Sequence, residues 1–165
     1  MIALVRVDNR LVHGQVAEAW VPRLGIRRLV VADDETAANP LARAAMTLPL
    51  PEDLHAEVLP VDSVDWAAVA ASPEPVLVLF REIGELRRAT GRGLSPALAP
   101  RVNLGNVHHA PGRRAVTPSV FLRDDELAAL RELAAAGFSV EARALPADSP
   151  SDVETMARRF QQAPG

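Results

Sequence analysis

The sequence predicts an α/β fold: a single-domain, open, mostly parallel twisted sheet of about six or seven strands with helices on both faces. Short apolar runs alternate along the chain with segments of helical periodicity, which is the pattern of βαβ units. The most continuous apolar run, PVLVLF at residues 75–80, is typical of a strand covered on both faces. The 165 residues correspond to one domain, residues 1–165, and no linker, repeat or low-complexity segment divides them.

The first half of the chain contains four of the predicted strands and three helices. We expect strands at residues 1–7, 27–33, 54–60 and 75–80. We expect helices at residues 15–24, 34–48 and 62–71. In the first helix Val16, Trp20 and Leu24 recur every four residues and mark a buried face. The second helix is interrupted or restarted at Pro40, and residue 62 or 63 caps the third.

The second half continues the alternation. We expect helices at residues 82–90, 124–137 and 149–160, and strands at residues 101–105 and 138–145. The segment 113–122 is rich in β-branched residues but contains Pro118, so it is predicted to be a bent or edge element. The last helix is predicted to begin with a capping box, in which Ser149 is the cap and Asp152 follows three residues later.

The composition excludes several classes of function. A net charge of -3 disfavours a nucleic-acid binder with a broad basic face. The chain has no cysteine, which excludes disulfides and thiolate chemistry, and its 18 basic residues are all arginine, which excludes lysine chemistry. No signal peptide is evident, and the apolar runs are far shorter than the ~20 residues of a membrane span. We therefore expect a soluble, cytoplasmic protein.

One polar stretch, VRVDNRLVHGQV at residues 5–16, stands out between the first strand and the first helix. In an open parallel sheet, ligands bind beyond the carboxyl ends of the strands. Residues 8–14 lie at such an end, residues 105–112 are predicted to follow the fifth strand, and Arg81 follows the fourth. These loops can converge on one site around His13.

The position of His13 favours phosphoryl chemistry. Backbone N–H groups and the positive end of the dipole at a helix start attract a phosphate and disfavour imidazolium, so the ring is expected to stay neutral and nucleophilic. Arg10 and Arg6 can bind phosphate oxygens, and Asp8 can orient the imidazole through its other nitrogen. The alternative is that His13 helps to cap the helix while both arginines pair with Asp8.

Several stretches together resemble the IIB component of the mannose/fructose/sorbose family of the bacterial sugar phosphotransferase system. They are RVDNRLVHGQV, Trp20, VVADDETA (30–37), VNLGNVHHAPGR (102–113), VTPSVFL (116–122) and VEARALPAD (140–148). The resemblance runs over residues 1–150 and implies that His13 is a transient phosphohistidine, phosphorylated on Nδ1. It also implies three partners: a IIA phosphodonor protein, the IIC/IID membrane components, and a sugar. The chain would then be a protein-histidine phosphotransferase, associated peripherally with the inner face of the membrane through IIC/IID.

The same resemblance suggests roles for individual residues. Arg10 matches the arginine expected to contact the phosphoryl group. The other candidates for binding or orienting the phosphate are Arg6, Asp8, Asn9, Gly14, Gln15, Arg81, Asn106 and His108. Many family members carry an N-V-G-G type loop after the fifth strand, where this chain reads NLGNVHH, so Asn106, His108 and His109 are expected to change what the pocket holds.

Other interpretations remain open from the sequence. The chain could be a regulatory phosphocarrier without transport, or a non-catalytic module that binds an anion or a nucleotide, although it has neither a G-x-G-x-x-G motif nor a P-loop. His13, His108 and His109 could form a zinc site, but solvated loop histidines are favoured, and no metal or cofactor is predicted. Asp33, Asp34 and Glu35 are interpreted as helix-capping residues. A homo-oligomer is possible, and the identity of the sugar is open.

Overall fold

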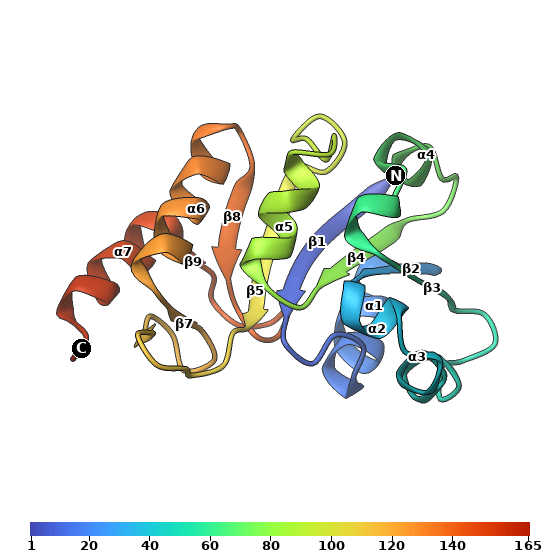
Figure 1. Cartoon of the computed structure of the whole chain (residues 1–165), viewed down its shortest axis with the longest axis horizontal. Helices are drawn as coiled ribbons and strands as arrows, with labels where there is room; N and C mark the ends of the chain where they lie inside the picture. Colours follow the sequence, from blue (N-terminus) through green and yellow to red (C-terminus); the bar gives the residue numbers. More distant parts are fainter.

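The structure, a computed structural model, describes residues 1–165 and confirms the predicted α/β class (Figure 1). Its main sheet has seven strands in the order β3-β2-β4-β1-β5-β8-β9. These strands are β1 (Ile2–Asp8), β2 (Arg28–Ala32), β3 (His55–Leu59), β4 (Val76–Phe80), β5 (Arg101–Asn106), β8 (Ser139–Ala142) and β9 (Ser151–Asp152). All neighbours in the sheet are parallel except β8 and β9. The central strand β1 therefore has its carboxyl end between those of β4 and β5.

Helices lie on both faces of the sheet. They are a π-helical turn η1 (Val16–Trp20), α1 (Val21–Leu24), α2 (Asp34–Ala37), α3 (Pro40–Thr47), the short 3-10 turn η2 (Val61–Ser63), α4 (Trp66–Ala70), α5 (Ile83–Thr90), α6 (Asp124–Ala135) and α7 (Val153–Gln162). None of them is long and apolar enough to cross a membrane.

Alternation along the strands divides the interior into two cores. On β1, Val5 and Val7 belong to a large core of 34 buried residues, to which α4, α5, α6 and α7 also contribute. Leu4 belongs to a smaller core of 10 buried residues on the opposite face, together with Val16 and Trp20 of the segment after β1. A strand covered on both faces explains why β1 and β4 are nearly continuous apolar runs.

Two local predictions need correction, and one is confirmed. The segment 113–122, predicted to be a bent or edge element, is bent at Pro118 into an antiparallel hairpin of β6 (Arg114–Ala115) and β7 (Phe121–Leu122), and it meets the chain after β5 through a single bridge between Val107 and Val120. The predicted capping box at Ser149 is absent, because residues 151–152 pair with β8 as the seventh strand of the sheet. Asp152 itself caps α7 by accepting a hydrogen bond from the Thr155 N–H at 2.8 Å.

The predicted helix 62–71 is also shorter than expected. A 3-10 turn occupies residues 61–63, and the α-helix begins only at Trp66 with Asp65 as its cap. The interruption predicted at Pro40 is confirmed, since Asn39 caps the separate helix α3.

Candidate functional site

The loop after β1 is a tight turn that places His13 at a helix start. The Leu11 N–H donates to the Asp8 carbonyl at 2.9 Å, which closes the turn. Leu11 has a φ of 56°, a left-handed conformation that is costly for a residue other than glycine. Its side chain is only 1% exposed in the smaller core, and this burial holds the strained turn in place. The His13 carbonyl accepts the first helical hydrogen bond, from the Ala17 N–H at 3.1 Å.

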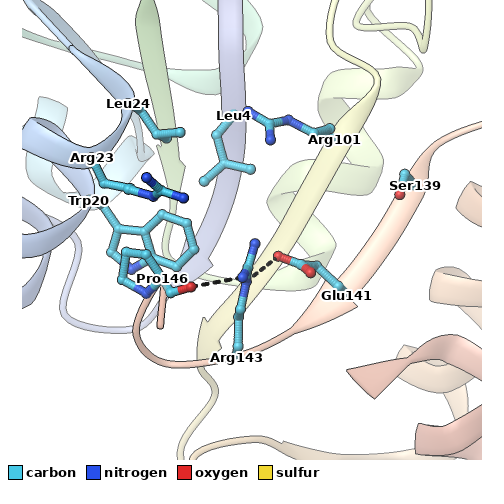
Figure 2. Close-up of a pocket in the computed structure, with 9 residues that line it drawn as sticks. All are labelled: Leu4, Trp20, Arg23, Leu24, Arg101, Ser139, Glu141, Arg143 and Pro146. Atoms are coloured by element: carbon cyan, nitrogen blue, oxygen red, sulfur yellow. Dashed lines mark hydrogen bonds and ion pairs between the residues drawn. The ribbon is translucent and has the colours of Figure 1, made fainter. Parts of the chain in front are cut away.

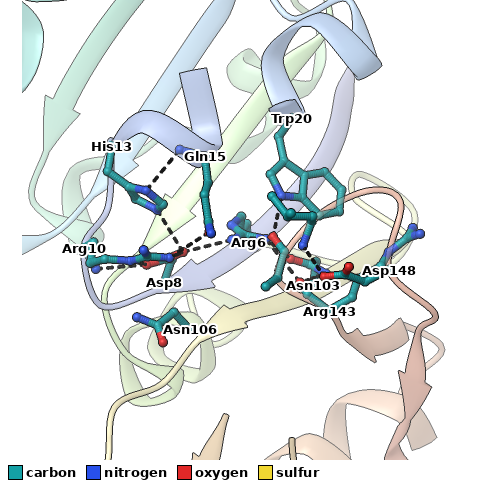
Figure 3. Close-up of polar contacts among 12 residues, drawn as sticks. Arg6, Asp8, Arg10, His13, Gln15, Trp20, Asn103, Asn106, Arg143 and Asp148 are labelled. Carbon is teal, nitrogen blue, oxygen red and sulfur yellow. Dashed lines mark hydrogen bonds and ion pairs between the residues drawn. The ribbon is translucent and has the colours of Figure 1, made fainter. Parts of the chain in front are cut away.

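The imidazole of His13 is held through both ring nitrogens (Figure 3). Its Nε2 lies 3.0 Å from Asp8 Oδ2, and the backbone N–H of Gln15 donates to its Nδ1 at 3.3 Å. A carboxylate accepts hydrogen bonds and an N–H donates them, so this arrangement selects the tautomer with hydrogen on Nε2 and an unprotonated Nδ1, whose lone pair accepts from the Gln15 N–H. The side chain is 16% exposed, which leaves the ring accessible from solvent.

Asp8 is the centre of the polar network. Its carboxylate is completely buried and accepts from Arg6 Nη2 at 2.9 Å, from Arg10 Nε at 3.1 Å and from Arg10 Nη2 at 3.2 Å. Burial raises the pKa of Asp8, but the hydrogen bonds from His13 and Arg10 and the charge of Arg6 outweigh it, so the pKa lies well below its usual range. Asp8 therefore carries a negative charge next to His13 at neutral pH.

Arg6 supports Asp8 from beneath and does not reach the surface. Its side chain is fully buried, and burial lowers the pKa of its guanidinium. Besides Asp8 it donates to Asn103 Oδ1 at 2.6 Å and to the Ala144 carbonyl at 3.1 Å, and its Cζ lies 5.0 Å from the centre of the Trp20 ring. A buried cation with these partners positions Asp8 and cannot itself touch a phosphoryl group outside.

Arg10 is the arginine that faces solvent. Its side chain is 38% exposed, and its Nη2 also donates to Gln15 Oε1 at 3.0 Å. In the amide orientation that gives both ends of Asn106 complementary partners, the Asn106 oxygen accepts from Arg10 Nε at 3.2 Å and its nitrogen donates to the Ser119 carbonyl at 3.0 Å. Arg10 Nη1 makes no hydrogen bond within the protein, so it remains free for an incoming anion.

Asn9 ties together the loops that follow three strands. Its backbone N–H donates to the carbonyl of Asn106 at the end of β5, at 3.0 Å, and its side-chain nitrogen donates to the carbonyl of Arg81 directly after β4, at 2.8 Å. Its side-chain oxygen accepts from the backbone N–H of His108. The predicted convergence of these loops is confirmed, and Asn9 is the residue that joins them. Gly14 lies at the helix start with no heavy atom near the position that a Cβ would occupy.

The guanidinium of Arg81 belongs to a second polar cluster. It donates to Asp33 Oδ1 at 3.1 Å, to Asp33 Oδ2 at 2.9 Å and to Thr36 Oγ1 at 3.0 Å. Asp33 also caps α2, as predicted, by accepting from the Thr36 N–H at 2.9 Å. Burial and the neighbouring Asp33 raise the pKa of Glu85 to about 8. Only the backbone carbonyl of Arg81 contacts the His13 loops, through Asn9.

The histidines after β5 do not form a metal centre with His13. No group of three or more His, Asp or Glu side chains lies close enough to hold a metal ion. His108 contacts the side chain of Asn106, and His109 meets the ring of Phe121 edge-on at 5.5 Å. Both histidines are exposed loop residues at the rim of the site.

The sequence analysis did not identify several residues that build the site. Gly105 makes room for Arg6, since a Cβ there would lie 2.0 Å from Arg6 Cζ. Asn103 is fully buried on β5 and binds Arg6, and a polar residue within the apolar run RVNLG was a signal for it. Arg113 holds the loop before β6 by donating to Glu126 Oε1 at 2.7 Å and to the His108 carbonyl at 2.9 Å.

A comparison with protein families gives a match over nearly the whole chain. The model of the PTS system sorbose subfamily IIB component matches residues 2–163. The chain belongs to this family. The IIB component is part of a sugar phosphotransferase system, and its family is a family of phosphotransferases.

Relatives and solved structures of IIB components agree with this assignment. The chain is 30% identical over 152 residues to the mannose-specific EIIAB component of Escherichia coli K12, covering 90% of this chain but only 46% of that protein. It is 28% identical to the N-acetylgalactosamine-specific IIB component 2 of Escherichia coli K12, covering 92% of this chain and 96% of the relative. The structure of manxB from Thermoanaerobacter tengcongensis superposes with a TM-score of 0.84 at 28% identity, covering 97% of this chain and 96% of that one.

Proposed function

We propose that this IIB component is a phosphocarrier. It accepts a phosphoryl group from a IIA protein on His13 and transfers it to a sugar that enters through IIC/IID membrane components. It would work in the cytoplasm, bound to the inner face of the membrane through those components. The observation that carries the proposal is the held imidazole, whose Nε2 contacts a buried carboxylate and whose unprotonated Nδ1 accepts from the backbone N–H of Gln15.

The contacts of His13 favour Nδ1 as the nucleophile. The Nδ1 lone pair attacks the phosphorus of the donor phosphohistidine, an N–P bond forms, and the electron pair of the donor's N–P bond returns to the donor nitrogen. The accepting ring keeps its hydrogen on Nε2 and becomes cationic. Because Asp8 is ionised 3.0 Å from Nε2, it stabilises that positive charge as it develops.

Two donors are available for the phosphoryl oxygens. The Gln15 N–H that now contacts Nδ1 lies beside the bond to be formed, and Arg10 offers its free Nη1 at the exposed side of the site. Phosphoryl transfer depends mostly on such positioning and charge stabilisation. In the second step a sugar hydroxyl attacks phosphorus, the electrons of the N–P bond return to Nδ1, and the hydroxyl proton is released to solvent.

Phosphorylation of the purified chain tests the proposal. With labelled phosphoenolpyruvate, Enzyme I, HPr and a cognate IIA, we expect acid-labile label on His13 and none in His13→Ala. His108→Ala is the matched control, because it removes an exposed histidine at the rim of the same site. Label that persists in His13→Ala would refute the proposal.

A transport assay separates the carrier role from a purely regulatory one. Membrane vesicles that contain IIC and IID should form sugar phosphate from the labelled wild-type chain. If the chain is labelled on His13 but never delivers phosphate to sugar with any of its cognate membrane components, transport is excluded and the regulatory role remains.

A further inference from the structure

The face of the sheet beside Trp20 contains a hollow that is separate from the exposed edge of the His13 site (Figure 2). Its volume is about 480 Å³, within the range of sites for small molecules. It is lined by Leu4, Trp20, Arg23, Leu24, Arg101, Ser139, Glu141, Arg143 and Pro146. The hollow exists because no helix covers this face of β5 and β8, whereas η1 and α1 cover the neighbouring β1.

The hollow is positively charged in a chain whose net charge is negative. Three guanidinium groups border it, from α1, β5 and the residue after β8, against a single carboxylate. Arg143 Nε pairs with Glu141 at 2.8 Å, so that carboxylate is already neutralised. Arg23 and Arg101 have no carboxylate partner, and the side chain of Arg101 donates only to the Ala3 carbonyl. Two cations on opposite sides of one hollow favour a ligand with an anionic group of high charge.

The remaining lining indicates what else the ligand carries. Ser139 and Glu141 offer hydroxyl and carboxylate oxygens, which can hydrogen-bond hydroxyl groups of a ligand. Leu4 and Trp20 line the inner end of the hollow, where their small exposed parts, 4% and 2%, give the carbon skeleton of a ligand a limited apolar contact. A bare inorganic anion would use only the arginines. A phosphate ester of a polyhydroxylated molecule, such as a sugar phosphate, would use all three kinds of group.

The hollow is linked physically to the His13 site. The guanidinium of Arg143 lies 5.5 Å from the centre of the Trp20 ring, and Arg6 lies near the same ring at 5.0 Å. The backbone carbonyl of Arg143 accepts from Arg6 Nη1 at 3.4 Å, and Arg6 in turn holds Asp8. Residue 143 thus lines the hollow with its side chain and contacts Arg6 with its backbone, so a ligand that shifts the backbone at residue 143 shifts a hydrogen-bond partner of the residue that positions Asp8.

We propose that this hollow is a binding site for a sugar phosphate and that its occupancy changes the rate at which His13 is phosphorylated. The first half is independent of the proposed carrier function, and the second half rests on it.

Binding can be measured on the whole unphosphorylated chain. Trp66→Phe leaves Trp20 as the only tryptophan, so its fluorescence reports on the hollow, and calorimetry gives an independent reading. The probes are glucose 6-phosphate, inorganic phosphate and glucose. The test variant is Arg23→Gln/Arg101→Gln, and the matched control is Arg131→Gln/Arg158→Gln, which removes two exposed arginines that do not line the hollow.

We expect glucose 6-phosphate to bind at least about tenfold more tightly than inorganic phosphate or glucose, since it uses all parts of the lining. The test variant should lose at least about tenfold in affinity, and the control and His13→Ala should bind like the parent chain. The site would be overturned if binding of glucose 6-phosphate did not saturate by about 10 mM. It would also be overturned if inorganic phosphate bound with equal affinity, or if the control variant lost as much affinity as the test variant.

The coupling has its own readout. Saturating glucose 6-phosphate should change the rate of His13 labelling in the parent chain and leave it unchanged in the Arg23→Gln/Arg101→Gln variant. An unchanged rate in the parent chain, with His13 labelled normally, would overturn the coupling while the carrier function stands. Failure of all labelling would instead refute the carrier function and leave the binding result intact.

Discussion

Replacing Gly105 with alanine is expected to disrupt the support beneath His13 without touching the site itself. A Cβ at position 105 would lie 2.0 Å from Arg6 Cζ and 2.1 Å from Arg6 Nη2. Such contacts are impossible, so one of the two groups must move. The backbone at Gly105 does not need glycine for its conformation, because Gly105 is part of β5 and has no positive φ. The whole effect therefore comes from the displaced guanidinium.

The size of the effect follows from what Arg6 would lose. The side chain is fully buried and cannot swing into solvent, and its bonds to Asp8 at 2.9 Å and Asn103 at 2.6 Å would be broken. Breaking a buried ion pair while leaving one charge uncompensated costs about 3–5 kcal/mol of the free energy of unfolding. For a chain of this size, that corresponds to a melting temperature lower by roughly 6–20 °C.

Urea unfolding of Gly105→Ala and Gly84→Ala measures the effect against a matched control. Gly84 lies in α5, and no atom lies within 4 Å of its added Cβ, so alanine should be neutral or stabilise the helix by up to about 1 kcal/mol. We also expect slower labelling of His13 in Gly105→Ala than in Gly84→Ala, because Asp8 loses its hydrogen bond from Arg6. A free energy of unfolding for Gly105→Ala within about 1 kcal/mol of the parent would show that Arg6 is not held as described.

Three further substitutions test other parts of the network. Arg10→Ala should slow labelling of His13 by about 10–100-fold by removing a charge-assisted contact to the phosphoryl group, and rates equal to those of the exposed Arg131→Ala would remove Arg10 from the site. Trp20→Phe should lower the free energy of unfolding by about 1–2 kcal/mol, because the indole Nε1 donates to the Ala144 carbonyl at 3.0 Å. Trp66→Phe is its control, since Trp66 Nε1 is buried without a partner, and equal losses in the two variants would contradict the assignment. Because the pKa of Glu85 is raised to about 8, the folded state binds a proton that the unfolded state loses near pH 4.5, so stability should fall as pH rises from 5 to 8. Urea unfolding at several pH values should show that fall in the parent and not in Glu85→Gln, and an identical slope in both would exclude Glu85 as its source.

Local patterns were sufficient for the elements whose neighbours along the chain decide them. The strands β1 and β4 and the helix α6 follow from apolar runs and helical periodicity in the sequence. The cap at Asp33 also follows from local chemistry, because a carboxylate three residues before a free N–H can bond it wherever the helix lies. The segment 149–152 was misassigned, because its pairing with β8 depends on a partner that periodicity does not identify.

The polar residues around His13 indicated phosphoryl chemistry, but they did not indicate which arginine is buried and which is exposed at the site. Arg6 and Arg10 are both near Asp8 in sequence, yet one is fully buried and the other is 38% exposed. Alternation along β1 placed Arg6 on the face toward Trp20, but whether that face was covered depended on the helix that crosses it. Arg81 was expected in the same pocket, and its guanidinium is instead bound to Asp33.

The amino-acid sequence alone determined that this chain forms a mostly parallel α/β sheet, because the periodicity of its apolar residues identifies the strands and helices. It also determined that a histidine follows the first strand at a helix start, because those residues are neighbours along the chain. Only the folded molecule decided which groups hold that histidine from below. Asn103, Gly105 and the Ala144 carbonyl lie about a hundred residues or more from Arg6 along the chain and meet it through strand pairing and packing. The uncovered face of β5 and β8, with its arginine-lined hollow, likewise exists only because the helices cover the sheet unequally.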